Sequence, residues 1–384
     1  MKKLPLFIIG ISILLTACSS SIFKRGQDSI LTSEQKFTGS EGLVFEFFEN
    51  APPKEVFDKS PFPVGIRLHN KGACDIGVTD PNDPLRCQSL TPGGGSPEID
   101  GILSIGFEDD YLEPPSSLQA LLPGIVSSIS ASKLPLAPSR PPTKGTIFFS
   151  LKGKDLEDSQ GEKQVITFNM YSKPLSTLDP QTEVRETPII ITACYKYRTS
   201  ASADICVDTD VFGFKEKQKG CEVKPIELKD QGAPLAVTKI DPQMNPEKDD
   251  PGFTRPMFVI TVENKGKGEA IQGNLGTIEG ACSSTPVGYK QWNRVDVQAF
   301  VLDRNGKKEQ LNCNLAEDNE PKDRLNQLAG VINLKGKEDR IRCQFKEKIG
   351  NDAGTFLTPL FIELDYGYTE SISRTVKIKK SLTY

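Results

Sequence analysis

Two segments of this chain repeat each other at a fixed separation, and this repeat limits the folds open to it. Thr187-Pro188 begins an apolar run that ends in Tyr195-Lys196-Tyr197, and Thr358-Pro359 begins a similar run that ends in Tyr366-Gly367-Tyr368. Both matches hold at one offset, since 358 − 187 and 366 − 195 both equal 171. We therefore expect two copies of one domain, with chance similarity between generic strands as the alternative.

The two copies also share a strand that ends in Asn-Lys-Gly. In the segment 62–72, every second residue from Phe62 to Leu68 is apolar, while Arg67 and His69 fall on the opposite face. The segment 258–266 has a similar pattern and the same ending. A side-chain period of two is typical of β-strands with one buried face. Because few stretches show helical periodicity, we predict an all-β fold of two tandem antiparallel β-sandwiches. The other expected strands are 43–48, 99–107, 145–151, 164–171, 188–197, 204–211, 235–240, 294–303, 329–334, 340–345, 357–366 and 373–379.

The N-terminus has the pattern of a secretory signal. Met1-Lys2-Lys3 is positively charged, residues 4–16 are mostly apolar, and the small Ala17 precedes Cys18. The apolar run of 13 residues is shorter than the roughly 20 residues that a membrane-spanning helix needs. Residues 1–17 are therefore predicted to be a signal peptide.

Leu15-Thr16-Ala17-Cys18 resembles the lipobox of prokaryotic membrane lipoproteins. The resemblance implies that Cys18 becomes the first mature residue and carries lipid, so that the protein is anchored to a membrane outside the cytoplasm, at the cell surface or on the periplasmic face. An ordinary signal peptide with an incidental cysteine is the alternative. Two or more acyl chains make a stable anchor, and the polar residues 18–40 are expected to be a flexible tether.

The repeat sets the expected domain boundaries. We place the first sandwich at 41–223, a linker at 224–233 and the second sandwich at 234–384. The first copy is longer because it contains a Pro- and Ser-rich insert, 113–142. Apolar residues of this insert follow helical spacing and predict a short helix that caps the sandwich or a contact surface for a partner or a lipid, with disorder as the third interpretation. These contact candidates are Leu118, Leu121, Leu122, Ile125, Val126 and Ile129.

The chain has nine cysteines, and lipidation of Cys18 would leave eight. An even number in an exported protein favours a disulfide framework. The closely spaced cysteine pairs of a zinc site do not occur, so no metal is expected. A hairpin with its turn near Thr199-Ser200-Ala201-Ser202 is expected to bring Cys194 and Cys206 together. The expected pairs are Cys74 with Cys87, Cys194 with Cys206, Cys221 with Cys282, and Cys313 with Cys343.

The paired tyrosines point to a particular kind of sandwich. Each pair shares a strand face with the apolar residues before it, so the rings are expected in the core, with each hydroxyl bonded to a backbone group. The tyrosine corner of immunoglobulin-like sandwiches is similar. Together with the Asn-Lys-Gly strand ends and the Thr-Pro openings, these tyrosines resemble the immunoglobulin-like surface modules grouped as cell-adhesion-related or NEW3-type domains, over most of residues 40–384. The resemblance implies two tandem immunoglobulin-like β-sandwiches at a cell surface.

Little in the sequence indicates catalysis. His69 is the only histidine, and it is expected on the solvent face of its strand. Gly93-Gly94-Gly95 is followed by Pro97 and a strand, whereas a phosphate-binding loop needs a helix after it. The acidic clusters at 80–83, 108–110 and 247–250 could supply ligands to calcium or a carboxylate pair for hydrolysis, but solvated loop charge is the simpler interpretation.

The charge balance and the pattern as a whole favour a binding protein. A formal net charge of −4 argues against nucleic acid as a partner, because phosphate backbones bind basic faces. We expect a lipid-anchored, extracytoplasmic, non-catalytic binding or adhesion protein without a cofactor, whose partner is a protein or a glycan. The alternatives are a structural or assembly subunit of a cell-envelope complex and, third, an enzyme with an unrecognised carboxylate site.

Overall fold

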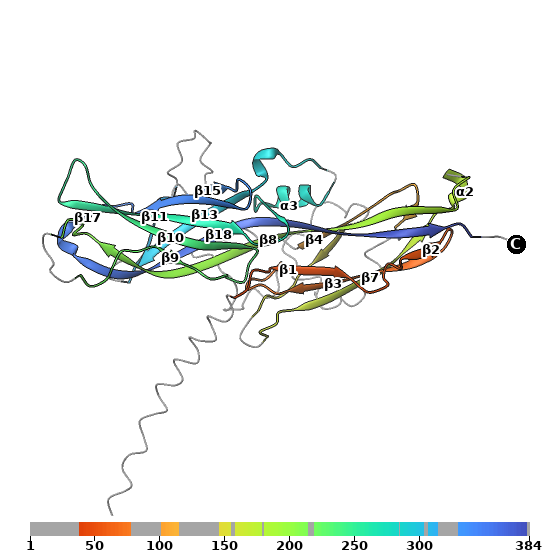
Figure 1. Ribbon diagram of the computed structural model, residues 1–384, viewed down its shortest axis with the longest axis horizontal. Helices are drawn as coiled ribbons and strands as arrows, with labels where there is room; N and C mark the ends of the chain where they lie inside the picture. The colour runs from red at the N-terminus through yellow and green to blue at the C-terminus, as the bar shows by residue number, and fades with distance from the viewer. Residues whose placement is uncertain are drawn as a thin grey trace, which may run out of the picture.

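The computed structural model shows an elongated body whose strands run along its long axis (Figure 1). Among the described residues, none of the helices combines the length and the apolar character needed to cross a membrane. The signal segment 1–17, Cys18, Cys87 and most of the insert 113–142 lie outside the described residues. The structure describes residues 38–77, 101–114, 146–154, 158–178, 180–213, 219–283, 285–302, 306–313 and 329–381.

Two strands of 25 residues each form the spine of the fold. β8 (Val184–Asp208) and β18 (Thr355–Lys379) pair antiparallel along their whole length, and both run along the middle of the molecule in Figure 1. Both are rich in β-branched and aromatic residues, and for much of their length every second side chain is buried. This pattern favours a strand with one face in the core. Further strands extend the pair to a nine-stranded sheet. Its order is β14 (Lys308–Gln310), β13 (Arg294–Leu302), β18, β8, β4 (Gly101–Phe107) and β6 (Thr146–Phe149), with β12 (Glu269–Ile271) and β2 (Glu55–Phe57) attached to β18 and β15 (Gly330–Asn333) attached to β13.

The first half of the molecule is a sandwich of a four-stranded sheet on one half of this spine. The small sheet has the order β1-β3-β7-β5, and its inward side chains join the main hydrophobic core. The short helix α2 (Leu175–Leu178) follows β7. The strands of this half are β1 (Leu43–Phe47), β2 (Glu55–Phe57), β3 (Pro61–Asn70), β4 (Gly101–Phe107), β5 (Leu112–Glu113), β6 (Thr146–Phe149) and β7 (Lys163–Ser172).

The second half repeats this plan on the other half of the spine. Here the small sheet has the order β16-β11-β10-β9, with β17 paired to β11. Its inward residues belong to the same continuous core as those of the first half. The strands of this half are β9 (Ile226–Glu227), β10 (Leu235–Pro246), β11 (Phe253–Asn264), β12 (Glu269–Ile271), β13 (Arg294–Leu302), β14 (Lys308–Gln310), β15 (Gly330–Asn333), β16 (Glu338–Gln344) and β17 (Ile349–Gly350).

The architecture confirms a predominantly β fold with antiparallel sheets, but the halves are joined more closely than the sequence suggests. The end of β18 pairs with the start of β8 and, in parallel, with β2, so Val376 and Ile378 are fully buried in the first half. The last strand of the second repeat therefore completes the sandwich of the first. The ranges 41–223 and 234–384 describe the repeats in the sequence, whereas in space the repeats share one sheet.

Four tyrosines lie at the point where the halves meet. Tyr195 faces Tyr368 and Tyr197 faces Tyr366 across the spine, and all four side chains are buried. Neighbouring ring centroids are 5.8 to 6.4 Å apart, a spacing at which each aromatic pair contributes about 0.5–1.5 kcal/mol beyond its burial. Burial raises the pKa of all four hydroxyls above the ordinary value of 10.0, so they remain protonated.

The two halves use these tyrosines in the same way. The Tyr197 hydroxyl accepts a hydrogen bond from the backbone of Cys74 at 3.2 Å, and the Tyr368 hydroxyl accepts one from the backbone of Gly268 at 2.9 Å. Each bond ties the spine to the loop that follows an Asn-Lys-Gly strand end. The predicted contact between a tyrosine hydroxyl and the backbone is thus confirmed for Tyr197 in the first half and for Tyr368 in the second.

Three disulfides brace the described part of the chain, and two of them differ from the expected pairs. Cys313 pairs with Cys343 as predicted, but Cys194 pairs with Cys282 and Cys206 pairs with Cys221. Cys74 is also disulfide-bonded, while its expected partner Cys87 lies outside the described residues.

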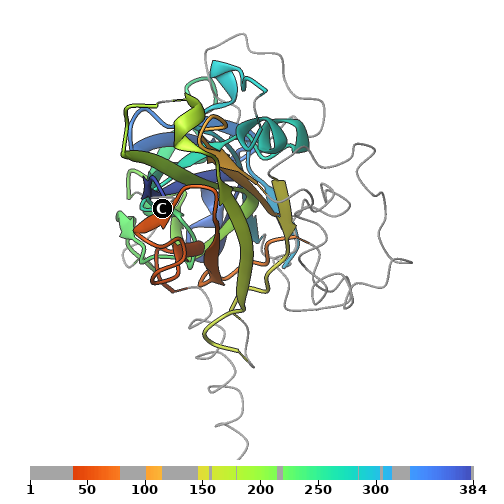
Figure 2. The same ribbon diagram turned by 90° about the vertical axis from the view of Figure 1, so that its right-hand side faces the viewer.

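The expected Cys194–Cys206 pair is wrong because the hairpin between these residues does not form. The chain stays extended through Thr199 and Ser202 as part of β8, and at about 3.3 Å per residue the two cysteines lie roughly 40 Å apart along the strand. Cys194 is bonded instead to the end of α3 (Leu275–Ala281), which lies outside the strand layers in the end-on view (Figure 2).

Candidate functional site

The residues that the sequence predicts for anchoring and contact lie outside the described residues. These are Cys18 and the six apolar residues of the insert, so lipidation and contact through the insert stay predictions. Within the described part of the chain, the side chains of most chemical interest gather on the outer face of the small sheet β1-β3-β7-β5.

His69 lies near the end of β3, on the face turned away from the core. Its neighbours Leu68 and Asn70 are buried, whereas Arg67 two residues earlier is exposed, as the alternation in the sequence predicts. The His69 Nε2 atom is 2.7 Å from the carbonyl oxygen of Gln160. Because a carbonyl can only accept, Nε2 carries a proton and donates it. No described residue bonds the second ring nitrogen, Nδ1.

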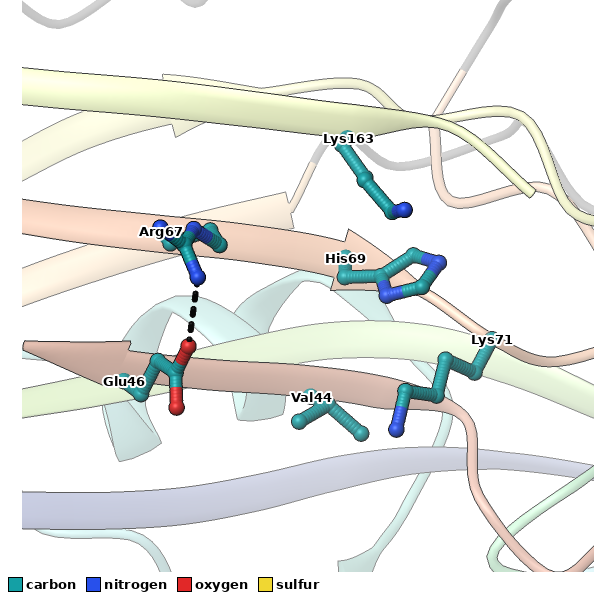
Figure 3. A pocket seen from close by; sticks show the side chains of 6 residues that line it. All are labelled: Val44, Glu46, Arg67, His69, Lys71 and Lys163. Carbon is teal, nitrogen blue, oxygen red and sulfur yellow. Dashed lines mark hydrogen bonds and ion pairs between the residues drawn. The ribbon is translucent and has the colours of Figure 1, made fainter. Parts of the chain in front are cut away.

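The register of the sheet brings further cations beside His69. Across β3, His69 faces Val44 of β1 on one side and Lys163 of β7 on the other. Paired residues of neighbouring strands place their Cβ atoms about 4.5–5.5 Å apart on one face. Figure 3 shows the ammonium groups of Lys163 and Lys71 on opposite sides of the His69 ring.

These side chains line a shallow hollow of about 330 Å³. With histidine neutral, its lining carries three cations and one carboxylate, and therefore a net charge of +2. Val44 supplies an apolar patch between the charged groups (Figure 3). The lining residues are Val44, Glu46, Arg67, His69, Lys71 and Lys163.

Two of the three cations already have carboxylate partners at the surface. Arg67 is 3.0 Å from Glu46, and Lys71 is 3.1 Å from Glu41. Exposed ion pairs of this kind contribute about 0–1 kcal/mol, so exchanging a partner for a ligand costs little. Lys163 forms no ion pair with any other residue that the structure describes, which leaves its full charge to the hollow.

A second hollow of about 610 Å³ lies beside the end of β18. Two of its three cations are engaged with the protein: Lys377 is 3.3 Å from Glu186, and the Arg374 guanidinium donates to the carbonyl of Phe48 and lies over the Phe47 ring. The third cation is Lys54, and the carboxylates of Glu49 and Glu186 also line this hollow, so its net charge is +1, lower than the +2 of the first hollow.

Each acidic cluster that the structure describes has at least one carboxylate in an ion pair. Glu108 lies 3.6 Å from Arg185, and Asp250 lies 2.6 Å from Lys348. Residues 80–83 lie outside the described ranges. Over the described residues, no three His, Cys, Asp or Glu side chains come together as metal ligands would.

Sequence reasoning placed His69 correctly on the outer face but missed the cluster around it. The alternation of β3 predicts that Arg67 and His69 point outward, and this signal was available. Lys163 is 94 positions further along the chain, and only the pairing of β3 with β7 brings it to His69. No family model matches this chain, and a search of curated protein sequences found no match.

Proposed function

We propose that this chain is a lipid-anchored, extracytoplasmic, non-catalytic binding protein. The observation that carries the proposal is the set of three disulfides in the described residues. Disulfides form and persist in oxidising environments outside the cytosol, and the three bonds here indicate such an environment.

The anchor is supported by the sequence that precedes the described body. Cys18 follows a short apolar run and small residues, and the first described residue is Thr38. The 20 residues 18–37 would then connect lipid and body. The flexible tether predicted from their composition would span about 25 Å on average and would leave the body free to meet partners near the membrane.

The shape of the body supports binding at its surface. We propose that each half derives from an immunoglobulin-like sandwich of the cell-adhesion-related or NEW3 type, since each half ties a tyrosine hydroxyl to the backbone near an Asn-Lys-Gly strand end. Rigid scaffolds of this kind present recognition surfaces on loops and sheet faces. A protein or glycan partner would bind the outer hollow around His69 or the insert 113–142.

A second function, a structural subunit of a cell-envelope complex, is favoured by one feature. The paired strands β8 and β18 run through both halves as one sheet, which suits a stiff spacer. Cross-linking in intact cells separates the two functions: one fixed neighbour in constant proportion indicates assembly, and varied or extracellular neighbours indicate adhesion.

Fractionation of cells that express the Cys18→Ala variant tests the anchor. We expect the wild-type chain in the membrane fraction and the variant in the soluble extracytoplasmic fraction, with the same three disulfides. A variant that stays in the membrane fraction would overturn anchoring through Cys18, and wild-type protein with free thiols would overturn the extracytoplasmic assignment.

A further inference from the structure

We propose that the hollow around His69 is a binding site for a phosphate group. The inference deepens the proposed binding function and rests on it, because it names the class of ligand. It is carried by the cations Arg67, Lys71 and Lys163, which line one hollow together with His69.

The second half of the molecule provides an internal comparison. Asn70 and Asn264 occupy equivalent strand ends, paired with Leu43 and Leu235 respectively. Counting along the paired strands from these positions matches each lining residue of the hollow with one in the second half. Val44, Glu46, Arg67, His69, Lys71 and Lys163 correspond to Ala236, Lys239, Thr261, Glu263, Lys265 and Glu338.

The same scaffold therefore carries two different charge patterns. The first half places three cations and one carboxylate at these positions, a net charge of +2, and the second half places two cations and two carboxylates, a net charge of zero. The decisive differences are at His69 and Lys163, where the second half has Glu263 and Glu338. Folding of this kind of sheet does not require a cation at the position of Lys163, since the equivalent sheet forms with Glu338 there.

The geometry of the donors suits a phosphate group. His69 and Lys71 reach the hollow from the end of β3 and the residue just beyond it, and Lys163 reaches it from β7. A phosphate group presents several strong acceptor oxygens. Lysine acts as a compact point charge with rotatable donors, so it can follow the oxygens. With Nε2 held by Gln160, a protonated ring would donate Nδ1–H to a further oxygen.

The size and openness of the hollow indicate a phosphate carried on a larger molecule. A volume of about 330 Å³ lies at the lower end of the range of about 300–1,000 Å³ found for ligand sites. It lies on a sheet face rather than in the interior, so the remainder of the ligand can extend into solvent. The phosphate could belong to a lipid headgroup or to a soluble phosphorylated molecule.

The test is a phosphorus NMR titration of the mature protein, purified in detergent, with inorganic phosphate. We expect Lys163→Glu, which introduces the residue type found in the second half, to weaken binding about tenfold or more, because it replaces a charge-assisted hydrogen bond with repulsion. Lys239→Glu makes the same charge change on an exposed residue of β10 and should leave binding unchanged. Equal binding by the wild type and Lys163→Glu, or equal weakening by both variants, would overturn the site.

A second titration with a short-chain phosphatidic acid identifies the source of the phosphate. Tighter binding of the lipid than of inorganic phosphate, lost in Lys163→Glu, supports a headgroup site, and similar binding of both supports a soluble phosphorylated ligand. Failure of these titrations is independent of the anchor: a protein with lipid on Cys18 and no phosphate binding would overturn only this inference, and phosphate binding by an unlipidated chain would overturn only the anchoring.

Discussion

Lys196 of β8 faces Gly367 of β18 across the spine of the molecule, and these two residues hold the same place in the two repeats. Their separation, 367 − 196 = 171, equals the offset between the two Thr-Pro openings. An approximate two-fold axis therefore passes between them and exchanges β8 with β18. Position 367 is a glycine, whereas position 196 is a lysine, because a Cβ atom on Gly367 would come within 2.8 Å of Ile271 and 3.0 Å of Ile278.

Replacing Tyr197 by Phe tests the tyrosine contact at this centre. The change removes the acceptor of the buried Cys74 N–H, and we expect it to lower the free energy of unfolding by about 1–3 kcal/mol. Urea denaturation measures the loss. Tyr171→Phe is the control, because Tyr171 is 39% exposed and should be neutral. Equal stability of the two variants would show that the buried hydroxyl does not stabilise the fold.

Gly266→Ala tests the close approach of an Asn-Lys-Gly strand end to the spine. A Cβ atom at Gly266 would overlap the Tyr368 hydroxyl and lie 2.9 Å from Pro234, so we expect a loss of about 1–3 kcal/mol from overpacking. Thermal or urea unfolding gives the value. Gly276→Ala, where the nearest atom is 3.7 Å away, should leave stability unchanged or slightly raised, and a similar loss there would contradict the packing argument.

Ile378→Ala tests the contribution of the end of β18 to the first half. Ile378 is fully buried, and truncation of such a side chain costs about 2–5 kcal/mol. Hydrogen exchange should accelerate in β2 and at the start of β8, which pair with this part of β18. Val184→Ala, at a 43% exposed position of β8, is the matched control. Faster exchange confined to the second half would contradict the shared sheet.

Glu370→Gln tests an unfavourable charge on β18. Burial raises the pKa of this carboxyl above its ordinary value of 4.5, and Glu41 adds to the rise while Lys267 opposes it. When a carboxyl has a higher pKa in the folded state, its protonation stabilises the fold at pH values below the unfolded-state pKa. That stabilisation is lost as the pH rises through the folded-state pKa. We therefore expect Glu370→Gln to be more stable than wild type at pH 7, by under about 1 kcal/mol because the group is only half-buried.

The pH dependence of that difference separates charge from packing. Below about pH 3, both the folded and the unfolded wild type carry a protonated Glu370, so the advantage of the variant should vanish there. Glu222→Gln, at an exposed position, is expected to change stability at neither pH. An advantage of Glu370→Gln that persists unchanged at low pH would contradict the burial of the charge.

Local patterns predicted much of the fold. The alternation in residues 62–72 and the two tyrosine pairs identified strands, buried faces and the repeat, because period two and aromatic burial are local properties. The turn expected at Thr199-Ser200-Ala201-Ser202 was wrong. Small polar residues favour turns, but tertiary contacts can hold the same residues in an extended strand. Here Thr199 is buried and its hydroxyl bonds the carbonyl of Leu235, which holds the chain as a strand.

Long-range pairing could not be predicted. The disulfide of Cys194 depends on where α3 packs, 88 positions along the chain, and the hollow depends on the register between His69 and Lys163. Registers of this kind are set by the whole core rather than by neighbouring residues. The charged residues that line the hollow can be identified in the sequence, but the sequence does not show that three separate segments bring them together.

The most direct test of the account is the non-reduced mass of the mature protein from its native membrane, with its peptides fragmented separately. The account predicts a lipid-bearing peptide that begins at Cys18, together with linked peptides that join Cys194 to Cys282, Cys206 to Cys221 and Cys313 to Cys343. A peptide that begins at Met1, accompanied by free thiols at these positions, would contradict an anchored binding protein outside the cytoplasm.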